Sequence, residues 1–324
     1  DEKSVTLYDG MILKLHYQVT IVIMTIGFLA VSQHWYAEQD MICKKLSNVE
    51  SKIPLNEEHL NICRSYPYVE EGEGEEVHRR YILYYRWIPW AFLLLTTMYY
   101  IPRIASKTFT RTITKQMKSM LVNARNESFG DPESVEFKKA VQYIRENKGS
   151  HNGIYWTYIG LNCLALGVDV FTMFLWDILL QGRFSRYGLS LPEWYKRNPK
   201  DFSDEISRTF PPFVKCKIES VHLIASADAK AYGCHMTYMQ LYEKVFILLW
   251  FWLVIMIIIT TVYIIYIMLF GPYVIVKGCL TRGRGVQGVT TVGDYYIKFR
   301  LKAHVSEAKC KHLFEADLDK YPLK

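Results

Sequence analysis

VFILLWFWLVIMIIITTVYIIYIMLF, residues 245–270, is the stretch that decides the fold. Its 26 residues include no charged side chain, which excludes an ordinary helix of a water-soluble core. At a rise of ~1.5 Å per residue such a helix is ~39 Å long, and the hydrocarbon layer of a bilayer is only ~30 Å thick. We therefore predict a membrane-spanning helix that tilts or extends past the membrane interface.

Three further apolar blocks have the length of a membrane span. Residues 15–36 contain no Asp, Glu, Lys or Arg, and residues 81–101 contain one charge, Arg86. Residues 154–180 are also apolar, although they include two aspartates. Most of the 39 Lys and Arg and 32 Asp and Glu residues lie between these blocks, so the average composition conceals a segregated chain. We predict an all-α membrane protein with four transmembrane helices.

The four spans divide the chain into nine segments. With four crossings, the two termini and the middle loop lie on one side of the membrane and the other two loops on the opposite side. We expect no cleavable signal peptide, because the first apolar block has neither a preceding basic region nor a small-residue cleavage site. The predicted segments are 1–14, the span 15–36, the loop 37–80, the span 81–101, the loop 102–153, the span 154–180, the loop 181–244, the span 245–270 and the C-terminal region 271–324.

The cysteines orient the chain. Lys and Arg are nearly balanced between the two sides, so the positive-inside rule does not decide. Cys43 and Cys63 lie in the first loop and Cys216 and Cys234 in the third, whereas the loop 102–153 has none. Two cysteine pairs on one side of a membrane are typical of disulfides in an oxidising exterior. We predict that both termini are cytoplasmic, although the sequence does not decide which cysteines pair.

The segment YYRWIPW, residues 84–90, carries the first resemblance to a known family. It resembles the innexin signature at the second span, YYQW followed by an aliphatic residue, Pro and an aromatic residue, with Arg86 in place of Gln. Tyr84, Tyr85, Trp87 and Pro89 match that signature. Pro89 removes one backbone hydrogen bond and should kink the helix, while the aromatic rings fill the wedge and anchor the span at the interface.

A second motif strengthens the resemblance, which covers about residues 9–270. Phe210-Pro211, the third-loop cysteines and Tyr242-Glu243-Lys244 are similar to the second outer loop of innexins and the entry to their fourth span. One departure is Lys44, which follows Cys43 where innexins usually have Trp. The resemblance implies the disulfides Cys43–Cys234 and Cys63–Cys216, which would tie the two outer loops together.

Resemblance to innexins implies a gap-junction channel subunit. Identical or homologous subunits, eight by family likeness, would form a ring in the plasma membrane at cell–cell junctions, in contact with membrane lipids. Two rings in apposed membranes would dock through their outer loops and pass ions and small molecules. The resemblance also implies that an N-terminal pore segment, 1–14 and expected to be incomplete, narrows the pore. The loop 102–153 and the region 271–324 would build a helical cytoplasmic dome, and the amphipathic stretch 136–146 is consistent with a packed helix.

Three acidic residues lie near or inside the predicted spans. Asp169 lies well inside the third span, where an ionised carboxylate is costly. We favour a buried hydrogen bond to a neighbouring helix over a functional site at this position. Glu38 and Asp40, just above the first span, are candidates for pore or vestibule charges that favour cations.

Other classes of function find little support in the sequence. The GxGxxG pattern of residues 283–288 has no βαβ unit around it, and His304, Cys310 and His312 lack the spacing of a zinc site. No HExxH, GxSxG or P-loop motif is present, so we predict no catalytic residue, metal or cofactor. The net charge of +7 is spread along the chain, which argues against nucleic-acid binding. An undocked hemichannel and a four-span adhesion or scaffold protein remain alternatives.

Overall fold

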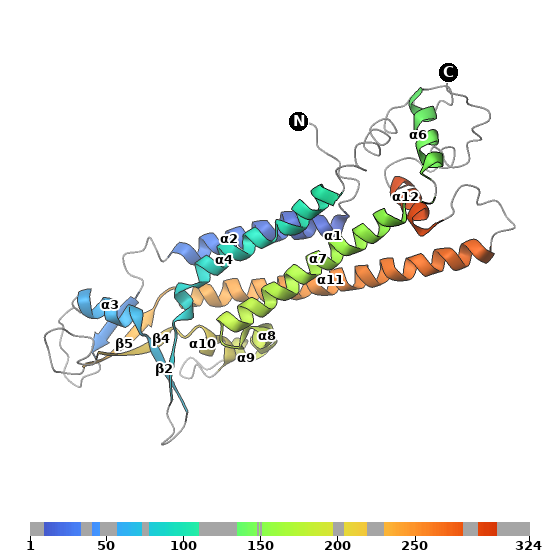
Figure 1. Cartoon of the computed structure of the whole chain (residues 1–324). Coiled ribbons are helices and arrows are strands. Elements are labelled where there is room, and N and C mark those ends of the chain that lie inside the picture. The colour runs from blue at the N-terminus through green and yellow to red at the C-terminus, as the bar shows by residue number, and fades with distance from the viewer. Residues whose placement is uncertain are drawn as a thin grey trace. The chain divides into compact units, whose positions relative to one another are not determined.

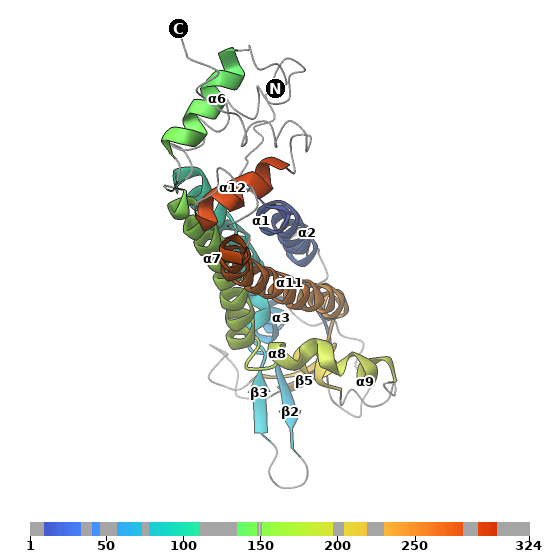
Figure 2. The same ribbon diagram turned by 90° about the vertical axis from the view of Figure 1, so that its right-hand side faces the viewer.

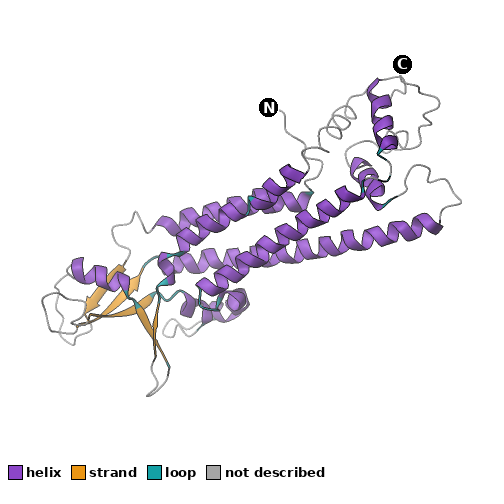
Figure 3. Ribbon diagram, in the orientation of Figure 1, coloured by secondary structure: helices purple, strands orange, loops and turns teal. Residues whose placement is uncertain are grey.

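The computed structural model describes residues 10–33, 41–45, 57–72, 78–109, 135–147, 149, 151–196, 204–218, 230–280 and 291–302. Figure 1 labels the helices and strands along the chain, and Figure 3 colours the two kinds of element separately.

Three helices within the described residues are long and apolar enough to cross a membrane. They are Met11–Ser32, Asn152–Leu179 and the part Met239–Gly271 of the longest helix. The first consists of α1 (Met11–Lys14), a π-helical segment (Leu15–Thr20) and α2 (Ile21–Ser32). The second is α7, and the third belongs to α11 (Met239–Leu280). Each overlaps a predicted span, because long apolar runs form helices whose backbone bonds are all internal.

The segment predicted as the second span is divided in the structure. Tyr81 ends strand β3, Tyr84–Arg86 form a 3₁₀ turn, and α4 covers Ile88–Met98. A turn at residues 99–100 separates α4 from a further helical stretch at 101–109. Pro89 is the second residue of α4, where its missing N–H would have no helical partner in any case. It therefore lies at the beginning of the helix, whereas the sequence suggested a kink inside one.

The chain forms two compact units. Unit 1 contains Asp1–Val19, Tyr99–Val168 and Met256–Lys324, and unit 2 contains Thr20–Met98 and Asp169–Ile255. Unit 2 holds all the described strands, together with the short helices α3 (Glu57–Ser65), α8 (Phe184–Tyr187), α9 (Leu191–Tyr195) and α10 (Glu205–Thr209). Unit 1 holds α6 (Val135–Glu146), which matches the predicted amphipathic stretch, and α12 (Val292–Lys302).

A five-stranded antiparallel sheet joins the two predicted outer loops. Its order is β1-β5-β4-β2-β3, so strands of the first loop lie on both sides of the pair from the other loop. Figure 2 shows β2 and β3 running side by side. This sheet was not foreseen in the prediction of an all-α protein, because short strands give only a weak signal in a sequence. The strands are β1 (Met41–Lys45), β2 (Tyr68–Glu71), β3 (His78–Tyr81), β4 (Phe213–Ile218) and β5 (Lys230–Met236).

Aromatic side chains form the core of unit 2. The rings of Phe92 and Trp176 lie 4.8 Å apart, and Phe246 lies 4.8 Å from Trp176. Phe210 of the third loop extends this cluster, with its ring 4.9 Å from that of Phe246. All four side chains are buried. The cluster thus anchors the third loop to the helices by edge-to-face and tilted ring packing, which stabilises aromatic pairs beyond simple burial.

Tyrosines form the core of unit 1. Tyr155 and Tyr158 of α7 pack with Ile267 of α11 and Tyr296 of α12. The Tyr155 hydroxyl donates a hydrogen bond to the carbonyl of Ile267, at 2.7 Å. Tyr263 of α11 packs against the same cluster. This core holds α12, a helix of the C-terminal region, against two of the long helices.

Candidate functional site

Two disulfides connect the loops that the predicted topology places on one side of the membrane. Cys43 of β1 lies directly opposite Cys234 of β5 and bonds to it, and Cys63 of α3 bonds to Cys216 of β4. This is the pairing that the resemblance to innexins implies. The sulfur atoms of Cys43, Cys63 and Cys234 lie within 4.8 Å of one another, so the two disulfides are neighbours. Because these sulfurs are oxidised, they are not available as thiolate ligands for a metal.

Each disulfide closes a long loop of the chain. The bonded cysteines are separated by 191 residues in one pair and 153 in the other. In the chain-entropy description, one cross-link over such a loop destabilises the unfolded state by roughly 5 kcal/mol. The second adds less, because the first has already brought the loops together. The sheet is thus held covalently as one domain built from two distant segments.

Tyr84 and Tyr85 attach this domain to the beginning of α4. The Tyr84 hydroxyl donates a hydrogen bond to the carbonyl of Thr209, in the third loop. The Tyr85 hydroxyl donates to the carbonyl of Arg64, in the first loop, at 2.7 Å. Both tyrosines are buried. The paired tyrosines of the YYRWIPW segment therefore bind one outer loop each, a role that the sequence analysis did not assign to them.

Arg86, Trp87 and Trp90 of this segment face outward. Trp87 is 64% exposed and Trp90 is 55% exposed, whereas Pro89 is buried in the first turn of α4. Arg86 is also exposed. Exposed tryptophans at the end of an apolar helix are typical of the membrane interface, where the ring is apolar and the indole N–H reaches water.

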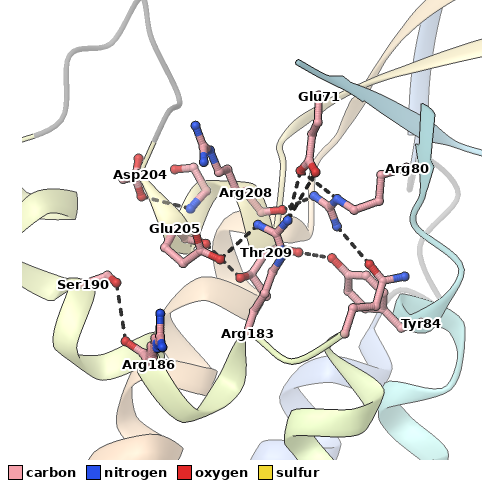
Figure 4. A network of polar contacts seen from close by, with 12 residues as sticks. Glu71, Arg80, Tyr84, Arg183, Arg186, Ser190, Asp204, Glu205, Arg208 and Thr209 are labelled. Carbon is pink, nitrogen blue, oxygen red and sulfur yellow. Dashed lines mark hydrogen bonds and ion pairs between the residues drawn. The ribbon is translucent and has the colours of Figure 1, made fainter. Parts of the chain in front are cut away.

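An ion-pair network links the β2–β3 hairpin to the third loop, as Figure 4 shows. Arg183 lies between two carboxylates, with Nη1 3.0 Å from Oε1 of Glu205 and Nη2 3.2 Å from Oε1 of Glu71. Glu71 also accepts a hydrogen bond from Nε of Arg80, at 2.8 Å. Arg80 in turn donates to the backbone carbonyl of Arg208. The hairpin of the first loop is thereby fixed to the helices of the third by charge-assisted bonds.

The turn after α7 places Arg183 in this network. Gln181 and Gly182 both adopt a positive φ, of 59° and 79°, and the N–H of Gly182 donates to the carbonyl of Asp177 at 2.7 Å. The Asp177 side chain then accepts a hydrogen bond from the N–H of Ser185, at 2.7 Å. A left-handed residue followed by Gly is a common helix stop. The chain reverses here, and Arg183 becomes the N-cap residue of α8.

One face of the sheet exposes apolar and charged side chains. Ile42, His235 and Phe213 follow one another across β1, β5 and β4, because His235 is in register with both of the others. Ile42 is 45% and Phe213 58% exposed, and the Phe213 and His235 rings lie 5.0 Å apart. The same face carries an ion pair between Lys215 and Glu70. We refer to this surface as the sheet face; it is a candidate contact surface for a partner.

The remaining predicted site residues are not brought to this domain surface. Asp169 lies on α7 and is fully buried, and its role as a buried hydrogen-bonding group stays a prediction. Glu38 and Asp40, the vestibule candidates, lie outside the described residues.

Sequence reasoning missed Glu71, Arg80, Arg183 and Glu205. Glu71 belongs to the acidic run at residues 70–76, and it lies on the strand opposite that of Arg80 in a hairpin. The signal that could have found them is the Gly-containing turn of YVEEGEGEEVHRRY, residues 68–81, flanked by short β-prone ends. Such a turn predicts a hairpin and brings acidic and basic residues to facing positions.

The long apolar helices and the cross-linked loop domain define a helical membrane protein with a covalently fixed domain outside the lipid. The comparisons with known proteins then give its family. The family model described as Innexin matches residues 9–281. The chain belongs to the innexin family, whose members are subunits of gap-junction channels rather than enzymes.

Individual innexins align over most of the chain. Innexin inx2 of Schistocerca americana is 24% identical over 341 residues, covering 96% of this chain and 92% of that protein. Innexin shaking-B of Drosophila melanogaster is 21% identical, covering 82% of this chain and 75% of its own length. Innexin inx2 of Drosophila melanogaster is 22% identical and covers 92% and 87%. The prediction of an innexin-type gap-junction channel subunit is thus confirmed.

Proposed function

We propose that this chain is a four-span subunit of a ring, and that two rings dock through the sheet face to form a channel between cells. The observation that carries this proposal is the pair of disulfides that fixes both loops in one sheet. A surface that must meet a partner loses less conformational entropy on binding when it is already rigid. Family membership supports an oligomeric gap-junction channel.

The proposed topology places both termini in the cytoplasm and the sheet outside the cell. Disulfides persist in an oxidising exterior and are rare in the cytosol, which supports this orientation. Among the described side chains, Cys163 of α7 is the one free cysteine. The fourth crossing would be made by α4, the turn at 99–100 and the helical stretch 101–109, which together cover 22 residues, the length of a span.

In a ring, the helices of each subunit contact either lipid or other helices. The exposed aliphatic and aromatic side chains of α11, which include Leu248, Ile258 and Val262, suit lipid tails. Buried polar groups such as Asp169 would pack between helices within or between subunits. From the family likeness we propose eight subunits and a cytoplasmic dome built from the loop 102–153 and the C-terminal region. Glu38 and Asp40 remain the proposed charges of the outer vestibule.

The sheet face is proposed to meet the same face of a subunit in the apposed ring. Lys44 and Lys215 lie in one row on either side of Gly233, and Glu70 pairs with Lys215, so the face carries both signs of charge. A surface that contacts a copy of itself needs this kind of self-complementarity. The apolar row across β1, β5 and β4 would supply the buried centre of the contact.

Two variants test whether the sheet face docks. Phe213→Glu places a charge at the centre of the proposed contact and should abolish junctional conductance between paired cells while rings still reach the surface. Leu189→Glu is the matched control, because Leu189 is 71% exposed but lies in the third loop outside the sheet. Junctional conductance of Phe213→Glu at the level of the control would refute docking through this face.

Cysteine replacement tests the cross-linked domain. Cys43→Ser should remove junctional coupling while the chain still inserts into the membrane, and Cys163→Ser, which breaks no disulfide, should leave coupling intact. Full coupling in Cys43→Ser would contradict the argument from the disulfides.

Single-particle imaging of the solubilised protein under non-reducing conditions would show the ring and its docking directly. Undocked rings with dye uptake by single cells would favour a hemichannel. Well-folded rings that conduct no current in liposomes would favour adhesion.

A further inference from the structure

Helix α12 begins against the beginning of α7, at a cluster of buried polar groups. Asp294, in the first turn of α12, accepts a hydrogen bond from Nδ1 of His151 at 2.6 Å and one from the N–H of Gly149 at 3.0 Å. His151 is 4% and Asp294 5% exposed. A partnered carboxylate in the first turn of a helix is also stabilised by the helix dipole. These bonds fix the N-terminus of α12 to the N-terminus of α7.

Two glycines, Gly293 and Gly149, allow α12 to approach the beginning of α7 closely. A Cβ atom at Gly293 would collide with the backbone of His151, and the N–H of Gly293 donates to Oδ1 of Asn152 at 3.0 Å. Gly149 has a φ of 88°, a left-handed conformation that side chains disfavour. The Tyr143 ring of α6 lies 6.0 Å from the His151 ring, edge to face. Helices α6, α7 and α12 therefore meet at His151.

Tyr296 of α12 packs against two tyrosines further along α7. Its ring lies 5.8 Å from that of Tyr155 and 5.3 Å from that of Tyr158. All three rings are buried. Because Tyr296 is only two residues after Asp294, a shift of the helix start would displace its ring. The contacts with α7 would then change, since a packed core does not deform smoothly.

Tyr158 in turn lies against the start of the first helix. Its hydroxyl is 2.8 Å from the hydroxyl of Tyr263 on α11. Gly10, the N-cap residue of α1, lies so close that a Cβ atom there would collide with the Tyr158 hydroxyl and lie 3.4 Å from that of Tyr263. The N-cap of α1 at Gly10 therefore lies directly against this pair of tyrosines.

We infer that α12 positions the first turn of α1 through Tyr296 and Tyr158, so that the C-terminal region regulates gating of the channel. The hydrogen bond between Asp294 and His151 holds α12 against α7. The ring of Tyr296 packs against that of Tyr158, and the Tyr158 hydroxyl lies against Gly10. This inference rests on the proposed function in one respect, namely that the subunits form a conducting ring. Release of α12 would leave the first turn of α1 less well supported and change gating.

We call the contacts from Asp294 through Tyr296 and Tyr158 to Gly10 the contact route. Hydrogen exchange of assembled rings tests this route without requiring that the rings conduct. The amides of Lys14 and Leu15 are bonded to the carbonyls of residues 10–12 and report on the first turn of α1. In Asp294→Ala, exchange at these two amides should rise about tenfold, the factor expected when local opening is favoured by about one hydrogen bond. Asp177→Ala is the matched control, because Asp177 also accepts a backbone N–H bond but lies outside the route.

Two exchange results would overturn the inference. One is faster exchange within α12 with no change at Lys14 and Leu15, which would make the contact purely local. The other is unchanged exchange in α12 itself, which would mean that Asp294 does not hold it. If Asp294→Ala does not assemble, Asp294→Asn retains one acceptor oxygen and is measured in its place.

A double-mutant cycle on gating separates a positioning role from general destabilisation. Asp294→Ala and Tyr158→Phe should each change the rate of the voltage-dependent decay of conductance by at least about fivefold, the lower end of typical coupling between linked sites. The double variant should match the single ones, because both remove the same connection. Additive effects would refute the route. Wild-type rings that do not conduct would refute the proposed function, while the exchange result would still decide the contact.

Discussion

Replacing Arg183 by methionine should loosen the third loop from the β2–β3 hairpin. Arg183 is 19% exposed and contacts both Glu71 and Glu205, whereas methionine is of similar length but cannot donate a hydrogen bond. After the replacement Glu71 keeps its bond to Arg80, at 2.8 Å. Glu205 loses its ion pair with Arg183. The hairpin would then be held to the third loop by fewer bonds, while both disulfides remain.

The expected cost follows from the exposure of the groups involved. A hydrogen bond to a charged group contributes about 1.5–3 kcal/mol when buried, and an exposed ion pair about 0–1 kcal/mol. The two carboxylates are 34% and 31% exposed, so water recovers part of the loss once the guanidinium is gone. Two such contacts at an intermediate value give a destabilisation of roughly 1.5–3 kcal/mol for Arg183→Met.

Thermal unfolding of the solubilised protein and local hydrogen exchange measure this effect. A loss of that size should lower the midpoint of unfolding by roughly 2–4 °C in a chain of this length. Exchange should rise at the amides of β3, whose strand carries Arg80. Arg186→Met is the matched control on the same short helix, because its side chain is exposed and pairs with no carboxylate among the described residues.

Equal unfolding temperatures and equal exchange in β3 for Arg183→Met and Arg186→Met would refute the role of Arg183 in holding the hairpin. A partial test of the same network is the double variant with Glu71→Gln. Its effect should be smaller than the sum of the single effects, because both changes remove one shared contact.

Two further predictions concern the attachment of the loops and the orientation of the chain. Tyr84→Phe removes the hydrogen bond to the third loop and should destabilise the protein by about 1 kcal/mol. Tyr100→Phe, at an exposed position, is the control and should leave stability unchanged. Equal unfolding midpoints for the two variants would contradict the role of Tyr84. The native sequon at Asn126 should carry no sugar when the protein is made in a eukaryotic cell, because the loop 102–153 is proposed to be cytoplasmic. A new sequon at exposed Tyr195, made by Tyr195→Asn with Arg197→Ser, should be glycosylated; sugar on Asn126 would reverse the proposed orientation.

The helical part of the fold could be predicted because its cause is local. An uncharged run such as residues 245–270 has one stable form in a bilayer, so composition and length alone indicate a span. The bounds of the helix were less predictable at residues 81–101, where apolar residues continue through a strand end, a 3₁₀ turn and a helix. Hydropathy does not distinguish these conformations, and only the position of Pro89 in the first helical turn would have suggested where the helix begins.

The candidate site was less predictable because it depends on partners far apart in the sequence. Arg183 meets Glu71 across 112 residues, and no local pattern connects them. The same holds for His16, which lies in a π-helical segment and is buried with Nε2 2.9 Å from the Thr260 hydroxyl. It was counted as part of an uncharged span. A polar group in such a position shows its role only once the facing helix is known.

The cross-links and the ion-pair network perform different tasks in the loop domain. The disulfides join β1 to β5 and α3 to β4, and neither of them includes a cysteine of β2 or β3. The network around Glu71 and Arg183 holds that hairpin, and Tyr84 and Tyr85 hold the whole domain to α4. Reduction should therefore release β1 and α3 from the central strands β5 and β4, whereas loss of Arg183 should release only the edge formed by β2 and β3. The β2–β3 edge can move without breaking a disulfide, so under the proposed docking of two rings we expect the contact to adjust there.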